Sequence, residues 1–102
     1  MEPLSRITAA TVDVLRCLAS ESEPTWGLQV VKSSQRPAGT VYPLLERLER
    51  AGWVESEWEF RTDRPGPRRR LYSLTTDGAA SATATIRSFD ARASATARVV
   101  TA

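Results

Sequence analysis

The first half of the chain places apolar residues at three- and four-residue spacing, the pattern of helices that bury one face. A first helix is predicted over residues 5–20, and its apolar positions are Leu4, Ile7, Thr11, Val14, Leu15 and Leu18. Residues 21–24 interrupt this pattern. Thr25 is then a candidate N-cap for a second, short helix that turns Trp26, Val30 and Val31 inward.

A stronger amphipathic pattern follows in residues 39–54. At about 100° per residue, one helix face gathers the apolar side chains Val41, Leu44, Leu45, Leu48 and Ala51. Pro43 conflicts least with this helix if it starts near Gly39 or Thr40, because first-turn amides have no helical partner. Gly52 is suited to end the helix in a left-handed cap. Two helices around a brief turn have helix-turn-helix spacing.

The hydrophobic period changes to two after Gly52, which predicts a strand over residues 54–60. One face of this strand is solvated and carries Glu55, Glu57 and Glu59. The other face is predicted to be buried and carries Val54, Ser56, Trp58 and Phe60. Residues 61–67 have the prolines and glycine of a turn, and residues 68–75 return as a second strand. The segment therefore predicts a β-hairpin, with Trp26 and Trp58 in the core.

The last helix is predicted to begin after N-cap candidates in residues 75–78 and to continue to about residue 100. Its apolar seam is narrow and rich in alanine. At 1.5 Å per residue the helix would be about 36 Å long, so part of it must project beyond a small core. A second subunit would cover that part, and the candidate interface residues are Ala82, Ile86, Phe89 and Ala93. A frayed tail is the open alternative.

Composition limits the classes of protein to consider. A chain of 102 residues with 41% apolar and 25% charged residues fits one small globular domain. No apolar run reaches membrane-spanning length and no signal segment begins the chain, so we expect a cytoplasmic protein without membrane contact. Histidine is absent and Cys17 is the single cysteine, expected in the core. Because no phosphate loop or nucleophile motif appears either, we expect no metal, no cofactor and no enzymatic activity.

The positive charge is concentrated in the hairpin tip. Net charge is +2, and Lys32 is the only lysine, so arginine supplies nearly all of the positive charge. Five arginines and one aspartate give residues 61–70 a charge of +4, directly after the three glutamates. Arg69 or Arg70 can pair across the hairpin with those glutamates. Arg64 and Arg68 are the arginines most expected to contact phosphate or a minor groove.

Three helices, a hairpin and a terminal helix predict a winged helix-turn-helix, mainly α with a small β-hairpin. The recognition helix is residues 38–51, and the wing is residues 61–69. A recognition helix contacts the major groove from its N-terminal end. Tyr42 can instead pack partly into the core, and Arg50 can pair with Glu46 four residues earlier. The predicted DNA contacts are Arg36, Thr40, Tyr42, Pro43, Arg47, Arg64, Arg68 and Arg69.

Three segments resemble the PadR family of bacterial transcriptional regulators, compact subgroup: residues 39–52, residues 69–75 with Gly78, and residues 24–28. The resemblance covers about residues 7–80. It implies a DNA-binding domain over residues 1–75 and a dimerisation helix over residues 76–102. It also implies a homodimeric repressor, built on the first and last helices, that binds double-stranded operator DNA and is released by a small molecule or another signal.

Some members of that family bind flat aromatic compounds with a tryptophan from the last helix. The three tryptophans of this chain, at positions 26, 53 and 58, all precede that helix, so such a pocket is not expected. The nature of an effector, if one exists, is unknown from the sequence. A winged-helix protein-interaction module without DNA binding is the alternative function, favoured by the neutral charge of the recognition helix and by the acidic strand.

Overall fold

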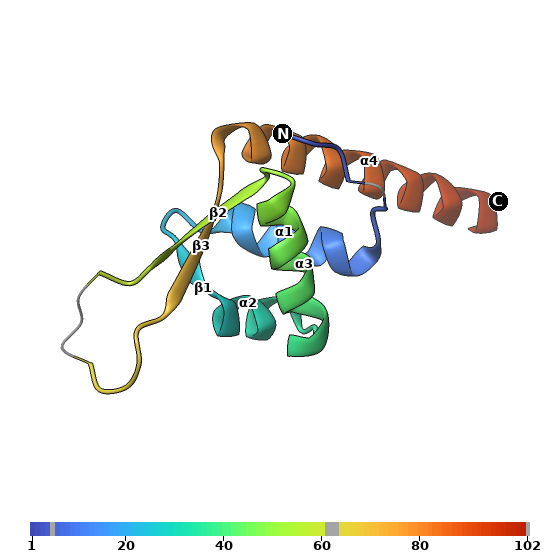
Figure 1. The fold of residues 1–102 in the computed structure, drawn as a ribbon. Coiled ribbons are helices and arrows are strands. Elements are labelled where there is room, and N and C mark those ends of the chain that lie inside the picture. The colour runs from blue at the N-terminus through green and yellow to red at the C-terminus, as the bar shows by residue number, and fades with distance from the viewer. Residues whose placement is uncertain (5, 61–63, 102) are drawn as a thin grey trace.

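The computed structural model describes residues 1–4, 6–60 and 64–101. The elements, in chain order, are α1 (Ala9–Ser20), β1 (Thr25–Trp26), α2 (Gly27–Ser34), α3 (Ala38–Arg50), β2 (Val54–Trp58), β3 (Arg70–Leu74) and α4 (Thr76–Thr101). They form a winged helix-turn-helix with a long C-terminal helix, as Figure 1 shows. The predicted fold class, mainly α with a small hairpin, is confirmed.

Helix α1 begins later than the apolar pattern predicted because Thr8 caps it. The Thr8 hydroxyl accepts a hydrogen bond from the Thr11 amide (3.2 Å), and the Thr11 hydroxyl accepts one from the Thr8 amide (3.4 Å). This reciprocal capping box satisfies two amides that a helix start would otherwise leave without partners. Leu4 still packs against the core, although it precedes the helix.

The predicted N-cap at Thr25 is wrong, because residues 25 and 26 form a short strand instead. Strand β1 pairs antiparallel with β3, Thr25 opposite Tyr72 and Trp26 opposite Leu71. Helix α2 then starts at Gly27, and Trp26 precedes it without a side-chain capping bond. The sheet order is β1-β3-β2, with β3 in the middle. The partners of β1 lie far along the chain, so local sequence carried no sign of this strand.

The core lies between α1, α2, α3 and the start of the sheet. Its most deeply buried side chains include Leu15, Leu45 and Leu48, as the helical periodicity predicted. Trp53 is also buried, at 5% exposure, and its indole N–H donates to the Glu2 carbonyl at 2.7 Å. The tryptophan on β2 that was predicted to be buried, Trp58, is 59% exposed.

Strand β2 shows why alternating apolar and polar residues did not predict which side chains are buried. Its first residue, Val54, is 2% exposed, whereas Phe60, beyond its last residue, is 86% exposed. The β2–β3 hairpin extends away from the helices, so the helices cover only its base (Figure 1). A period of two therefore identified the strand correctly but overestimated how much of one face is covered.

Helix α3 begins at Ala38, so Pro43 lies beyond the first turn. Proline has no N–H for the carbonyl of Gly39 four residues earlier, and both residues are on the exposed side. The predicted left-handed position at Gly52 is confirmed, with φ of 87°. The next backbone amide, that of Trp53, returns to the Leu48 carbonyl (2.9 Å) and turns the chain into β2.

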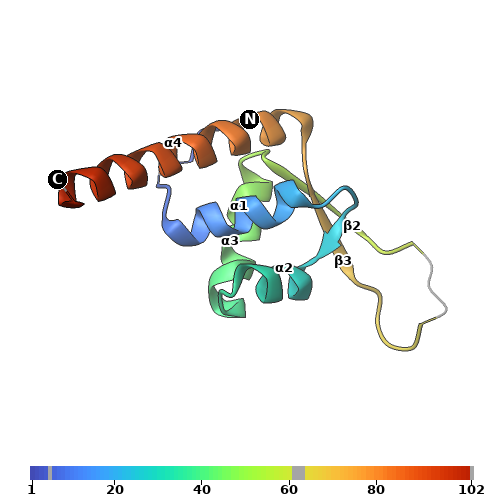
Figure 2. The ribbon, with the colours of Figure 1, turned by 180° about the vertical axis from the view of Figure 1, so that it is seen from behind.

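Helix α4 begins as its N-cap candidates predicted: the Thr75 hydroxyl accepts from the Gly78 amide at 2.9 Å. A Cβ atom on Gly78 would lie 1.9 Å from the Trp53 carbonyl oxygen, so the α4 backbone packs directly on the corner after α3. Further along, Arg16 of α1 forms an ion pair with Asp90. Figures 1 and 2 show the helix continuing past the rest of the molecule. None of the helices in the described ranges is long and apolar enough to cross a membrane.

The seam of α4 divides into a buried and an exposed part. Ala82 is completely buried in the core of its own chain, so its assignment to a dimer interface is wrong: its small side chain lets α4 approach the core. Ile86 is half-buried and packs against the same core. Phe89 is half-buried and Ala93 is exposed.

Candidate nucleic-acid interface

Helix α2 and the N-terminal end of α3 lie on the side of the molecule opposite α4, and the hairpin extends past that side (Figure 1). Tyr42 on α3 is 43% exposed. A Cβ atom on Gly27 would lie 2.5 Å from the Tyr42 ring, so the ring packs directly on the backbone at the start of α2 and a larger residue there would displace it. Tyr42 therefore packs partly against α2, as one alternative expected, and its contact with DNA stays a prediction.

The exposed face of α3 has two flanks. Arg47 is five residues after Tyr42, about 140° around the helix. Arg47 lies beside Glu2 and Pro3 of the N-terminal segment, and Tyr42 faces the hairpin. Pro43 is exposed between them, and Thr40 is half-buried.

Arg50 and Glu46 form the expected pair along α3. Their side chains meet at 2.8 Å, and both are more than 70% exposed. An exposed pair of this kind contributes little stability, but it balances the charge of Arg50. The exposed face of α3 therefore offers little net positive charge of its own.

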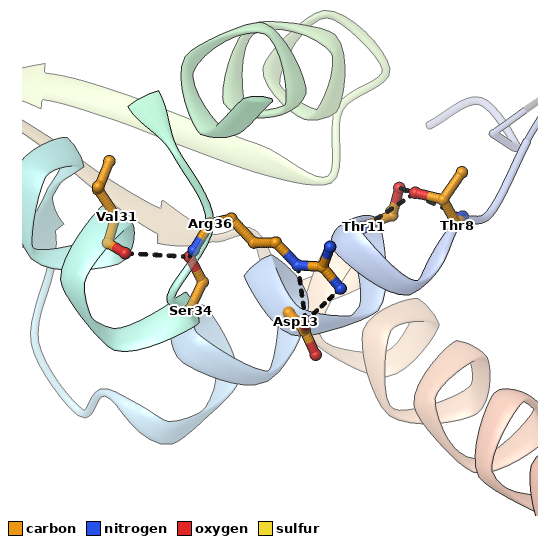
Figure 3. A network of polar contacts seen from close by, with 6 residues as sticks. All are labelled: Thr8, Thr11, Asp13, Val31, Ser34 and Arg36. Atoms are coloured by element: carbon orange, nitrogen blue, oxygen red, sulfur yellow. Dashed lines mark hydrogen bonds and ion pairs between the residues drawn. The ribbon is translucent and has the colours of Figure 1, made fainter. Parts of the chain in front are cut away.

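Arg36, a predicted DNA contact, is held by helix α1 instead. Its Nε and Nη2 atoms lie 3.0 and 2.9 Å from the same carboxylate oxygen of Asp13 (Figure 3). The Arg36 amide also donates to the hydroxyl of Ser34, which is 8% exposed and in turn donates to the Val31 carbonyl. These contacts fix the turn between α2 and α3 against α1.

Glu59 organises the base of the wing. Its carboxylate forms an ion pair with Arg64, and it accepts the Arg69 amide at 3.3 Å. Its own amide donates to the Arg69 carbonyl at 2.8 Å. Arg64 was expected to contact phosphate, and the structure shows that its guanidinium already has an acidic partner. Residues 61–63, which carry part of the predicted wing charge, lie outside the described residues.

Arg70, at the start of β3, turns towards the helices. Its Nε donates to the Ser56 hydroxyl at 3.1 Å, and its guanidinium lies 3.9 Å from the Glu49 carboxylate and 5.1 Å from the centre of the Trp58 ring. Arg70 was expected to pair across the hairpin with Glu55, Glu57 or Glu59. It contacts Ser56 there instead, and its acidic partner, Glu49, comes from α3.

Arg69 and Arg68 differ from these neighbours. The Arg69 guanidinium lies 3.5 Å from the centre of the Trp26 ring, on which it stacks. Across the described part of the chain, neither Arg68 nor Arg69 has an acidic side chain as partner, and the Arg69 Nε atom is buried without an acceptor. Arg68 is exposed. Within the described ranges, no carboxylate pairs with either guanidinium, whereas those of Arg36, Arg64 and Arg70 each have one nearby.

These side chains border a shallow hollow of ≈ 370 Å³ between the wing and the helices. Three aromatic residues line it together with Arg64, Arg68, Arg69 and Arg70: these are Trp26, Tyr42 and Tyr72. Burial, with the nearby Glu49 carboxylate, raises the pKa of Tyr72, so its hydroxyl stays neutral and can donate a hydrogen bond. We call this surface the wing hollow. Its lining combines guanidinium groups with aromatic rings.

Two residues that shape this surface were missed by the sequence reasoning. Glu59 was assigned only to a solvated strand face, and Trp26 only to the core. Both residues gain their role from pairings across the sheet. Trp26 lies opposite Leu71. Glu59 follows Trp58, which lies opposite Arg70. Alternating polarity identifies a strand but not its register, so it could not have identified these contacts.

The described residues contain no group of three histidine, cysteine, aspartate or glutamate side chains that could hold a metal ion. The surface carries cationic, aromatic and hydrogen-bonding groups. Groups of these kinds contact phosphates, sugars and base edges in complexes of proteins with DNA.

The chain is similar to a family of transcriptional regulators and to solved structures of its members. The model of the transcriptional regulator PadR-like family matches residues 14–84. No match is found among curated proteins. A PadR-like transcription factor from Bacteroides fragilis has a similar structure, with 24% identity, 87% of each chain covered and a TM-score of 0.65.

Two other solved structures are also similar. A PadR family transcription regulator from hypervirulent Clostridium difficile has 20% identity over 87% of this chain and 97% of its own, with a TM-score of 0.70. A mutant MepR from a multidrug-resistant S. aureus clinical isolate has 28% identity over 78% of this chain and 55% of its own, with a TM-score of 0.64. The family match spans most of the chain, and the fold agrees with it: the protein belongs to the PadR-like family of transcriptional regulators.

Proposed function

We propose that this protein represses transcription by binding operator DNA as a homodimer, with the N-terminal half of α3 in the major groove and the wing along the flanking backbone. The observation that carries the proposal is the pair of arginines, Arg68 and Arg69, whose charge no acidic side chain balances within the described residues. They border the wing hollow together with Tyr42 of the recognition helix. A cationic wing beside an exposed helix N-terminus suits a DNA duplex.

Which arginines contact DNA in this proposal follows from the partners that each has within the protein. Arginine binds phosphate oxygens through two parallel N–H groups, which requires a guanidinium edge that is not already paired. Arg68 and Arg69 meet this condition better than Arg64, which is paired with Glu59. In the proposal Arg64 supports the wing, and Arg68 and Arg69 contact phosphates. On α3, the exposed or half-buried residues offered to the groove are Thr40, Tyr42, Pro43 and Arg47.

The dimer in this proposal is built on the outer part of α4. Residues 1–75 would bind DNA, and residues 76–102 would join the subunits. At 26 residues the helix is about 39 Å long, and residues 91–96 are exposed beyond the ion pair between Asp90 and α1. Phe89, Ala93 and the edge of Ile86 are the apolar groups that a partner would cover. Two such subunits would address half-sites about one helical turn apart.

The DNA proposal is tested by fluorescence anisotropy with the DNA upstream of the protein's own gene, at several salt concentrations. Arg68→Ala should weaken binding and lower the salt slope, by about 0.9 for each phosphate that the variant no longer neutralises. Arg87→Ala, on the exposed surface of α4, is the matched control and should change neither quantity. An unchanged slope for both Arg68→Ala and Arg69→Ala would rule out the wing assignment.

The dimer proposal has a separate test in sedimentation equilibrium. Phe89→Glu should place a charge on the covered face and give monomers, whereas Ser88→Glu, one residue earlier and exposed, should leave the dimer mass unchanged. A dimer that survives Phe89→Glu would place the interface elsewhere.

Repression and its release by a signal are tested on the promoter. Deleting the gene should raise transcription of a reporter placed behind its upstream DNA. A fall in reporter activity would mean activation instead. A compound that releases repression should weaken binding of the purified protein to the same DNA.

A second candidate, a protein-interaction module, is favoured by one observation: Trp58 and Phe60 are 59% and 86% exposed, next to the exposed Glu55 and Glu57. Apolar rings on a surface are typical of protein contacts. If no DNA binding occurs even at low salt, this second function takes the place of the first.

A further inference from the structure

We propose that Trp26 is a positioning residue for DNA binding: its ring holds the Arg69 guanidinium as a preorganised contact for a backbone phosphate. This inference rests on the proposed function, since it concerns how the wing contacts DNA. It gives Trp26 a role that lies outside the recognition helix and outside the wing itself.

The contact geometry supports this role. Strand β1 places Trp26 opposite Leu71, two residues after Arg69, so the ring lies beside the point where the chain leaves the wing. The guanidinium lies 3.5 Å from the ring centre. A cation over an aromatic face is attracted to it, and a stacked guanidinium still presents N–H groups at its edge, in the plane that a phosphate approaches.

The backbone of Arg69 is fixed independently of its side chain. Its amide donates to the Glu59 carboxylate (3.3 Å), and its carbonyl accepts from the Glu59 amide (2.8 Å). Glu59 thus holds the main chain and Trp26 holds the side chain. Ordering a long arginine side chain before binding removes part of the entropy cost of binding.

The side-chain N–H groups of Arg69 differ from its main-chain groups. Among the described residues its side chain has no hydrogen-bond acceptor, and its Nε is buried. Arg70, one residue later, donates to Ser56 and lies near Glu49. Two adjacent arginines are therefore held in different ways: Arg70 by polar partners, and Arg69 by an aromatic ring, with no acceptor for its guanidinium among the described residues.

Trp26 also connects the wing to the recognition helix. It directly precedes α2, whose first residue, Gly27, packs under the Tyr42 ring of α3. The positions of Arg69 and Tyr42 are thus linked through two neighbouring residues. A phosphate bound at Arg69 would fix where the N-terminal end of α3 enters the major groove.

A double-mutant cycle tests the inference with a mixed-sequence duplex of about 24 base pairs, because a phosphate contact does not depend on operator sequence. Trp26→Leu and Arg69→Ala should each weaken binding about tenfold and lower the salt slope equally. The double variant should bind no more weakly than either single variant. Trp26→Phe, which keeps an aromatic face, should retain most of the affinity and the full slope.

The outcomes separate the two levels of the proposal. If the unmodified protein binds neither the mixed duplex nor its upstream DNA, the proposed function fails. Suppose instead that the protein binds and that Arg69→Ala lowers the salt slope. The positioning role of Trp26 is then overturned if Trp26→Leu leaves the slope unchanged, or if the effects of the two substitutions on affinity add. Circular dichroism must show that each variant is folded.

A measurement on the unmodified protein covers the case in which Trp26→Leu does not fold. The Arg69 Nε–H resonance, assigned by its absence in Arg69→Lys, should appear upfield because of the Trp26 ring current. It should shift when the duplex is added. A resonance at an ordinary arginine position, or one that ignores the duplex, would overturn the inference.

Discussion

The helical core and the wing are held by different contacts. In the core, Leu15, Leu45 and Leu48 are at most 1% exposed and are fixed by close packing on all sides. At the wing, Arg69 stacks on the Trp26 ring and Arg64 pairs with the Glu59 carboxylate, and both arginines stay partly exposed. Buried apolar area dominates stability, whereas exposed charge dominates the affinity for an anionic partner.

This difference separates the effects of mutation. Changes in the core should lower the free energy of unfolding, and DNA binding should weaken only as folding weakens. Changes at the wing should leave stability nearly unchanged and alter the salt dependence of binding.

Leu45→Ala should have the largest effect. Leu45 is 0% exposed, and removing its side chain leaves a cavity, so the free energy of unfolding should fall by about 2–5 kcal/mol. Urea denaturation at fixed protein concentration measures it. Leu28→Ala is the control, since Leu28 is 39% exposed and its truncation should destabilise the protein much less. Equal effects for both would mean that packing on α3 does not dominate stability.

Gly78→Ala and Gly39→Ala should have opposite signs. A Cβ on Gly78 would overlap the Trp53 carbonyl, so this variant should be destabilised by about 1–3 kcal/mol despite the helix preference of alanine. Around Gly39 a Cβ would meet nothing within 4 Å, so alanine should add about 0.5–1 kcal/mol. Thermal or urea unfolding of both variants measures these changes in the free energy of unfolding. Stabilisation by Gly78→Ala would contradict the close packing of α4 on the corner after α3.

Arg36→Ala tests whether a partly exposed ion pair is structural. The Arg36 and Asp13 side chains are 36% and 38% exposed, so removing their pairing should cost about 0.2–1 kcal/mol of stability. We expect Arg36→Ala and Asp13→Asn to leave the salt slope of DNA binding at its original value. A lower slope for Arg36→Ala alone would support the predicted contact of Arg36 with a phosphate.

Cys17 should give the smallest effect, visible only at high pH. Burial raises the pKa of the Cys17 thiol, with Asp13 and Glu21 adding to the shift. The folded state then favours the neutral thiol: this stability is complete below the unfolded pKa and is lost as pH rises through the folded pKa. Urea midpoints should therefore fall less between about pH 8 and pH 10 in Cys17→Ala than in the original protein. An identical decline would show that the thiol ionises as readily in the folded protein.

Much of the helical fold was predictable because a helix that buries one face has apolar residues at regular spacing in the local sequence. The spacing of Val41, Leu44, Leu45 and Leu48 identified α3 and its buried face, and all four are buried. The start of α4 after Thr75 and the left-handed Gly52 were predictable for the same reason, since caps depend on neighbouring residues. The capping box at Thr8 was also local and was missed, so the start of α1 was predicted too early.

The exposed aromatic and ionic contacts were not predictable in the same way. Trp58 and Trp53 are both tryptophans near one strand, and only the extent of the helical layer leaves one exposed and buries the other. Ala82 fits a dimer seam by spacing, and only the approach of α4 to the core shows that it is buried.

The sequence by itself determined the helices, the hairpin, the arginine-rich tip and the family, because periodicity, caps and motifs are encoded by residues close in the chain. The tertiary structure decided which arginine has which partner. Glu59 binds Arg64, Asp13 binds Arg36, and Trp26 stacks under Arg69. Each of these depends on strand register or on the distance between elements, which loops and packing set and which no local pattern records.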